Sequence, residues 1–79
     1  MNKSEILAKL QEIFCDILDN EEIVLQFGTI ADDIEEWDSL SHVMLIVEIE
    51  KIFNVKFSSS EMHKWCKVED IIDSIINHS

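Results

Sequence analysis

Apolar residues recur at helical spacing in three stretches of the chain, and this periodicity constrains the fold more than any other feature. In the first stretch, about Lys3 to Leu18, the apolar positions fill an arc of roughly 140° at about 100° per residue. The last stretch, about Val68 to Asn77, fills a similar arc of roughly 140°. A middle stretch runs from Ser39 to about Asn54. Three such segments predict helices that bury their apolar sides against one another.

Residues that favour tight turns are scarce, which argues against a protein of many strands. The chain has no proline and one glycine, Gly28. Ser58 to Glu61 reads S-S-S-E, a capping box that predicts a short helix to about Lys64. We therefore predict an all-α fold: a small four-helix bundle with a long connection between the first two helices and a short third helix. Residues 1–79 are expected to form a single domain with a modest core.

The long connection, residues 19–38, contains eight acidic residues and no basic one. A structureless loop of this length is uncommon in a compact domain and is often functional. We expect its apolar residues to fix it to the bundle, with the help of a helical turn. These residues are Ile23, Val24, Leu25, Phe27, Ile30, Ile34 and Trp37.

The charge and the cysteines restrict the partners and the location. Six basic and seventeen acidic residues give 6 − 17 = −11, a charge that disfavours nucleic acid and anionic membranes and suits basic patches on protein partners. No apolar run approaches the roughly 18 residues of a membrane span. Cys15 and Cys66 lack a CxxC spacing, which favours reduced thiols and a cytoplasmic location. A monomer is expected.

The middle helix carries apolar residues on two sides. One set should face the core: His42, Leu45, Ile46, Ile49, Ile52 and Phe53. The other set lies about 160° away, flanked by Glu48 and Glu50, and we call it the docking strip: Leu40, Val43, Met44 and Val47. This second face either packs against the loop or the third helix, or remains exposed for a partner. We favour exposure, because the strip begins directly beside Ser39.

Ser39 has a reachable hydroxyl at a helix start, where either Asp38 or Ser39 is a good N-cap. A Ser39–His42 pair resembles a nucleophile and base, but no oxyanion loop or orienting carboxylate is evident, so we expect no catalytic residue. His42 is instead expected to be a partly buried structural histidine. Trp37 and Trp65 are expected to be packing anchors, and Trp37 could also line the site.

No metal site is expected. The acidic residues of the connection lack the spacing of an EF-hand loop, and the single glycine precedes them. His63 and Cys66 have an H-x-x-C spacing, but no second ligand pair follows.

Several motifs together resemble the acyl and peptidyl carrier protein family. Asp38-Ser39-Leu40 opens a helix, and the apolar pattern from Val43 to Ile49 follows it. Further matches are Glu48 to Phe53 (E-I-E-K-I-F), Val55-Lys56-Phe57 before the short helix, and Val68 to Ile72 (V-E-D-I-I). The resemblance covers nearly the whole chain, and it implies a four-helix bundle.

The resemblance also implies a stand-alone carrier that is not itself an enzyme. A phosphopantetheinyl transferase would move 4′-phosphopantetheine from coenzyme A to Ser39, with Asp38 next to magnesium in that complex and Leu40 inserted into the partner. The thiol of the arm would hold an acyl or aminoacyl group as a thioester. An acyl- or amino-acid-activating enzyme would load it, and a downstream synthase or transferase would receive it.

Some residues depart from the pattern of fatty-acid carriers. Trp37 precedes the D-S-L motif where a small residue is common, and Ser41 and Met44 occupy positions that are commonly acidic. Lys51 adds a positive charge. These departures favour a specialised pathway, polyketide, nonribosomal peptide or related, over general fatty-acid synthesis. The alternative from another class is a helical protein–protein interaction module without a prosthetic group, in which Ser39 is only an N-cap.

Overall fold

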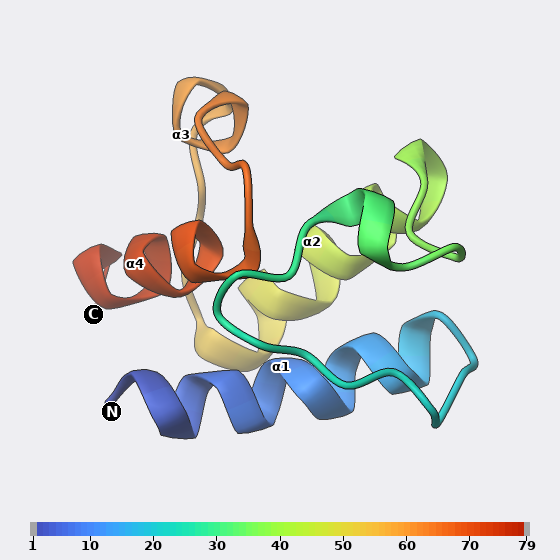
Figure 1. Cartoon of the computed structure of the whole chain (residues 1–79). Helices are drawn as coiled ribbons and strands as arrows, with labels where there is room; N and C mark the ends of the chain where they lie inside the picture. Colours follow the sequence, from blue (N-terminus) through green and yellow to red (C-terminus); the bar gives the residue numbers. More distant parts are fainter. Residues whose placement is uncertain (1, 79) are drawn as a thin grey trace.

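The computed structural model describes residues 2–78, which form a four-helix bundle (Figure 1). The described residues contain no strand, so the all-α prediction is confirmed. The predicted bounds agree with the observed helices to within one residue. The helices are α1 (Lys3–Ile17), α2 (Ser39–Phe53), α3 (Ser59–His63) and α4 (Val68–His78), with a 3₁₀ turn η1 (Ala31–Asp33) in the long connection.

The core lies between α1, α2 and α4, and α3 packs at one end of the bundle (Figure 1). α1 contributes the apolar side that its periodicity predicted, and α4 contributes Val68, Ile71, Ile72 and Ile75. The centre is filled by side chains whose exposed fraction is below 2%: Phe14, Ile6, Leu10, Leu45, Ile49, Ile72 and Val68.

Each of the first three α-helices begins with a capping box. The pairs are Asn2 with Glu5, Asp38 with Ser41, and Ser58 with Glu61. In each pair one side chain accepts a hydrogen bond from a backbone N–H that has no partner within the helix. The S-x-x-E prediction for the third helix is confirmed, and the N-cap of α2 is Asp38 rather than Ser39.

The long connection is fixed to the bundle by one side chain and by its own backbone. Gln11 of α1 donates a hydrogen bond to the Ile23 carbonyl and accepts one from Leu25 N at 2.6 Å. Farther along, the carbonyls of Thr29 and Phe27 accept from the first N–H groups of α4, at 2.9 and 3.0 Å. The connection therefore caps α4 and lies across the bundle.

Most apolar residues of the connection pack as predicted, but two do not. Ile23, Leu25 and Ile34 are buried. Val24 and Ile30 are exposed, so the expectation that they fix the loop was wrong. The hydrogen bonds of Gln11 hold the backbone on either side of Val24, and its neighbours Ile23 and Leu25 turn inward while Val24 points outward.

Ile52 was predicted on the core side of α2 and is instead 48% exposed. It lines a shallow cleft at the edge of the α1–α2 contact together with Lys9, Glu12 and Asp16. The polar side of α1 therefore faces this position, and Ile13 is the apolar residue of α1 that lines the same cleft. Its place at the margin of the predicted arc explains why helical periodicity alone misassigned it.

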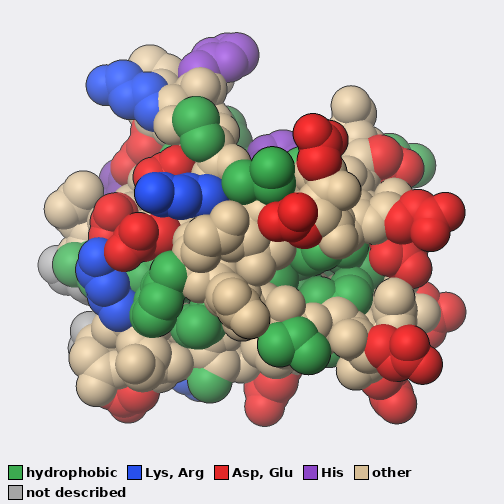
Figure 2. Space-filling view, viewed as in Figure 1, with side chains coloured by type: hydrophobic (Ala, Val, Ile, Leu, Met, Phe, Trp, Pro, Cys, Tyr) green, Lys and Arg blue, Asp and Glu red, His purple; other side chains and the backbone are tan. Residues whose placement is uncertain are grey.

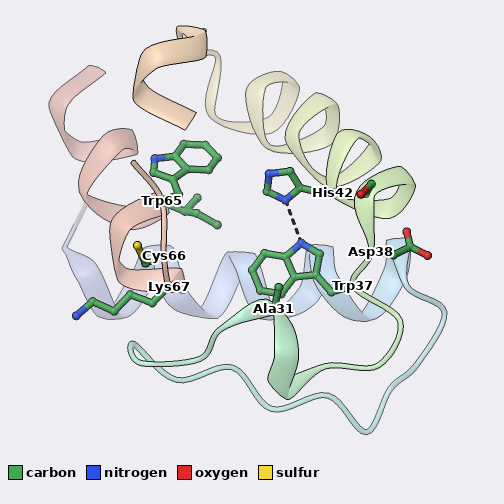
Figure 3. Close-up of a pocket in the computed structure, with 9 residues that line it drawn as sticks. Ala31, Trp37, Asp38, His42, Trp65, Cys66 and Lys67 are labelled. Carbon is green, nitrogen blue, oxygen red and sulfur yellow. Dashed lines mark hydrogen bonds between the residues drawn. The ribbon is translucent and has the colours of Figure 1, made fainter. Parts of the chain in front are cut away.

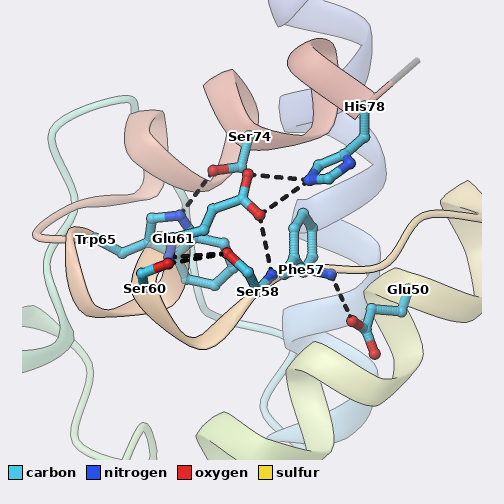
Figure 4. Close-up of polar contacts among 8 residues, drawn as sticks. All are labelled: Glu50, Phe57, Ser58, Ser60, Glu61, Trp65, Ser74 and His78. Atoms are coloured by element: carbon cyan, nitrogen blue, oxygen red, sulfur yellow. Dashed lines mark hydrogen bonds and ion pairs between the residues drawn. The ribbon is translucent and has the colours of Figure 1, made fainter.

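Polar contacts hold α3 against α4 (Figure 4). His78 Nε2 lies 2.9 and 3.0 Å from the two carboxylate oxygens of Glu61. The hydrogen bond of His78 is the largest cause that keeps the pKa of Glu61 below its ordinary value. Trp65 Nε1 donates to Ser74 Oγ at 2.8 Å. These polar side chains hold the short helix together with Met62, which packs against the core.

Candidate functional site

Ser39 is the first residue of α2, and its side chain is exposed. Within the described residues its hydroxyl takes part in no hydrogen bond. The neighbouring Asp38 caps the helix: its carboxylate accepts from Ser41 N at 2.9 Å. The hydroxyl of Ser39 therefore stands free at a helix N-terminus, where the dipole favours an attached anion.

Ser41 fixes the turn that presents Ser39, and sequence reasoning missed this role. Its hydroxyl accepts from Asp38 N at 2.8 Å and donates toward the Glu36 carbonyl at 2.8 Å. The spacing D-x-x-S was the available signal, since a polar residue three positions after an N-cap can close a capping box. The hydrogen bonds from Ser41, first from its backbone and then from its side chain, lower the pKa of the Asp38 carboxyl.

Trp37 and His42 form a hydrogen-bonded aromatic pair beside Ser39 (Figure 3). Trp37 Nε1 donates to His42 Nδ1 at 3.0 Å, and the two rings are stacked with centroids 5.9 Å apart. Trp37 also meets Phe14 of the core edge to face at 4.9 Å. His42 is half-buried, as predicted, and burial lowers the pKa of its imidazole.

This pair excludes a serine–histidine dyad. A general base needs a free lone pair on a ring nitrogen. Because Nδ1 of the neutral ring accepts from Trp37, Nε2 carries the proton and has no lone pair to offer. His42 cannot take the proton of Ser39 in this arrangement.

A cavity of about 460 Å³ opens beside Ser39, and we call it the aromatic cavity (Figure 3). Its walls come from η1, the start of α2, the α3–α4 connection and α4. Trp37 lines this cavity, and Trp65 reaches it from a distant segment that no local pattern connects to Ser39. The lining residues are Ala31, Trp37, Asp38, Ser39, His42, Trp65, Cys66, Lys67 and Ile71.

The docking strip is exposed along α2, from 73% for Leu40 to 47% for Met44. Its packing against the loop or α3, the other reading of the sequence, is therefore excluded. Of the two flanking acids, Glu50 is half-buried and accepts from Phe57 N at 2.9 Å, so it holds the α2–α3 connection (Figure 4). Glu48 is also partly exposed.

Charge is unevenly distributed over the surface. On the face shown in Figure 2 acidic side chains are spread across the view, whereas most of the visible lysine side chains lie on the side of α3 and α4. Within residues 2–78, no group of three or more His, Cys, Asp or Glu side chains is arranged to hold a metal ion. None of the described helices is long and apolar enough to cross a membrane.

Known proteins resemble this chain in sequence and in fold. A curated acyl carrier protein of Rubrobacter xylanophilus is 37% identical over 79 residues, which cover 99% of this chain and 96% of that protein. The chain belongs to the acyl carrier protein family. It is thus a carrier and not an enzyme, as the resemblance implied.

A solved structure agrees with this assignment. The solution structure of a holo acyl carrier protein from Geobacter metallireducens matches this carrier with a TM-score of 0.86 and 40% identity. The match covers 91% of this chain and 83% of that one. No model of a known protein family matches the chain.

Proposed function

We propose that this chain carries its cargo on a 4′-phosphopantetheine arm attached to Ser39 Oγ. The observation that supports this most is the contrast between two nearby serines: Ser41 Oγ is engaged in the capping box, whereas Ser39 Oγ is exposed and makes no hydrogen bond within the described residues. The family membership and the holo form of the Geobacter relative support the prosthetic group. When bound, the arm supplies a terminal thiol that holds the cargo as a thioester.

The chain's own residues fit an attached phosphodiester. Ser39 lies at the positive end of α2, which favours an anion. Asp38 stays ionised over a wider pH range because its hydrogen bonds lower the pKa of its carboxyl, and an ionised carboxylate suits its predicted place beside magnesium in the transferase complex. His42 cannot serve as a base, so a phosphopantetheinyl transferase must remove the proton of Ser39.

The docking strip would be the surface on which partner enzymes rest. Leu40 is the most exposed of its residues and is next to Ser39, so a partner that acts on Ser39 meets Leu40 first. Trp37 and Glu48 would contact the partner at the margins, and Glu50 would do so only with the part of its carboxylate that Phe57 leaves free. The partners are the transferase, an acyl- or amino-acid-activating enzyme, and a downstream synthase or transferase.

A specialised pathway remains our proposal over general fatty-acid synthesis. The strip is apolar, and Lys51 lies exposed beyond it, so this face offers less acid to basic patches than fatty-acid synthase enzymes would need. A cytoplasmic location, consistent with the free thiols of Cys15 and Cys66, is part of the same proposal. Equal rates of loading by a fatty-acid malonyl transferase and by a specialised loading enzyme would contradict the pathway preference.

The test of the attachment is loading with coenzyme A and a broad-specificity phosphopantetheinyl transferase, followed by intact mass measurement. We expect the wild-type chain to gain the mass of one phosphopantetheine. The Ser39→Ala variant should gain none while keeping its helical circular dichroism. An unmodified wild-type chain would instead support an interaction module without a prosthetic group.

A further inference from the structure

We propose that the aromatic cavity is a cargo site that takes a planar aromatic acyl group. This inference rests on the proposed function, because a cargo reaches the cavity only through an arm attached to Ser39, which lies on the cavity's rim. It goes further in naming the chemical class of the cargo and the residues that receive it.

The walls suit a flat ring. Trp37, His42 and Trp65 converge on the cavity from three segments (Figure 3). The rings of His42 and Trp65 are 6.3 Å apart at 80°, while those of Trp37 and His42 are stacked. A ring that enters this space can stack on one aromatic wall and meet another edge to face, the two geometries that aromatic pairs prefer. An aliphatic group of equal size gains only apolar contact there.

The aromatic walls are held in place before any cargo arrives. Trp37 Nε1 is bonded to His42, and Trp65 Nε1 is bonded to Ser74 Oγ at 2.8 Å. Buried Ile71 of α4 also lines the cavity. Side chains that are already ordered lose little conformational freedom on binding, so the cavity favours a rigid cargo that matches its shape.

Among the polar groups that line the cavity, the Nε2–H of His42 can orient the cargo. Since His42 Nδ1 accepts from Trp37, Nε2 carries a hydrogen, and within the described residues no acceptor is assigned to it. Figure 3 shows this nitrogen on the side of the ring that faces Trp65. A carbonyl oxygen of the bound thioester is a suitable acceptor. A cavity of about 460 Å³ in which aromatic and apolar walls combine with some polar side chains, here Asp38, Ser39 and Lys67, is typical of small-molecule sites.

The centre of the bundle offers less to a long aliphatic chain. It is filled by side chains with exposed fractions below 2%, among them Phe14, Leu45 and Ile72. Close-packed interiors of this kind admit a chain only if several side chains move. The aromatic cavity offers space directly beside Ser39 without such movement.

The test compares two arms of equal carbon number, benzoyl and cyclohexanecarbonyl, loaded from their coenzyme A derivatives by the transferase. The chain has two tryptophans, and both line the cavity, so the two indole N–H resonances report on it without labels at other sites. We expect nuclear Overhauser contacts from the benzoyl ring to both indoles. We also expect its thioester to hydrolyse about two- to tenfold more slowly than the cyclohexanecarbonyl thioester, each normalised to the free pantetheine thioester.

Two variants separate a cargo site from a structural role. Trp65→Leu should abolish the difference in hydrolysis between the two cargoes, whereas Trp65→Phe, which keeps an aromatic face, should retain it. Equal protection of both cargoes on a normally loaded protein, or no contact between the benzoyl ring and either indole, would overturn the cargo site alone. If no arm is added to Ser39, the proposed function fails and this inference fails with it.

Discussion

The two sides of α2 carry similar apolar residues but differ in how far these residues are buried. On the side toward the bundle, Leu45 and Ile49 are almost completely buried and His42 is held by Trp37. On the solvent side, Leu40, Val43, Met44 and Val47 are exposed, and Ser39 stands free at the start of the strip. One side stabilises the fold, and the other remains available to partners. Apolar character alone therefore does not identify a core residue in this helix. The side of the helix on which a residue lies separates Leu45 and Ile49 from the strip, but it fails for Ile52 at the margin of the core side.

The largest expected effect separates the two sides by stability. Leu45→Ala should lower the free energy of unfolding by about 2–5 kcal/mol, because it opens a cavity in a filled core. Val47→Ala, on the exposed strip, should change it by no more than about 0.5 kcal/mol. Urea unfolding followed by circular dichroism measures both. Similar losses in the two variants would show that the strip is packed.

The next effect concerns binding, in which a change on the exposed side of α2 should matter more than it does for stability. Met44→Glu should weaken association with the phosphopantetheinyl transferase at least about fivefold, because it places a charge in an apolar contact, while unfolding changes by no more than about 0.5 kcal/mol. Ala8→Glu on the exposed side of α1 is the matched control for added charge and should leave association unchanged. A large loss of stability in Met44→Glu would place Met44 in the core.

A smaller effect distinguishes the two serines at the start of the helix. Ser41→Ala should destabilise the protein by about 1 kcal/mol, because it removes the side chain that accepts from Asp38 N. Ser39→Ala should change stability by less than about 0.5 kcal/mol, because its hydroxyl has no partner within the described residues. Thermal unfolding of the two variants side by side checks this order, and the reverse order would contradict the assigned cap.

The smallest effect comes from pH and concerns the buried side. Burial lowers the pKa of His42 in the folded state, so the unfolded state binds the proton more readily. The contribution of neutral His42 is fully present above the ordinary pKa of about 6.5 and is lost as pH falls from there through the lower folded pKa. Nuclear magnetic resonance titration of the imidazole should therefore give a pKa below 6.5. A value at or above 6.5 would contradict the burial of the ring against Trp37.

Local sequence patterns were enough to predict the helices, but they did not predict the contacts between distant segments. The bounds of α1, α2, α3 and α4 followed from apolar periodicity and capping residues, both of which act within a few positions of the chain. The exposure of the docking strip was also predicted from the sequence, because its residues lie on the side of α2 opposite Leu45 and Ile49. Ile52 was misassigned because the sequence does not show that polar residues of α1 lie opposite it.

The candidate site could likewise be predicted only where it depends on one short segment. Asp38, Ser39 and the lining role of Trp37 are features of one short segment. The aromatic cavity also needs Trp65, which reaches it from the α3–α4 connection and is fixed there by Ser74. The pairing of Trp37 with His42, which removes His42 as a base, depends on the rotation of two side chains that no sequence spacing determines.

The central claim is that the free hydroxyl of Ser39, and not the engaged hydroxyl of Ser41, carries the prosthetic group. Tandem mass spectrometry of the protein loaded by the transferase tests this directly, because fragment ions between residues 39 and 41 separate the two serines. The account predicts the whole added mass on Ser39 and none on Ser41. Added mass on Ser41, or a loaded Ser39→Ala variant, would contradict it.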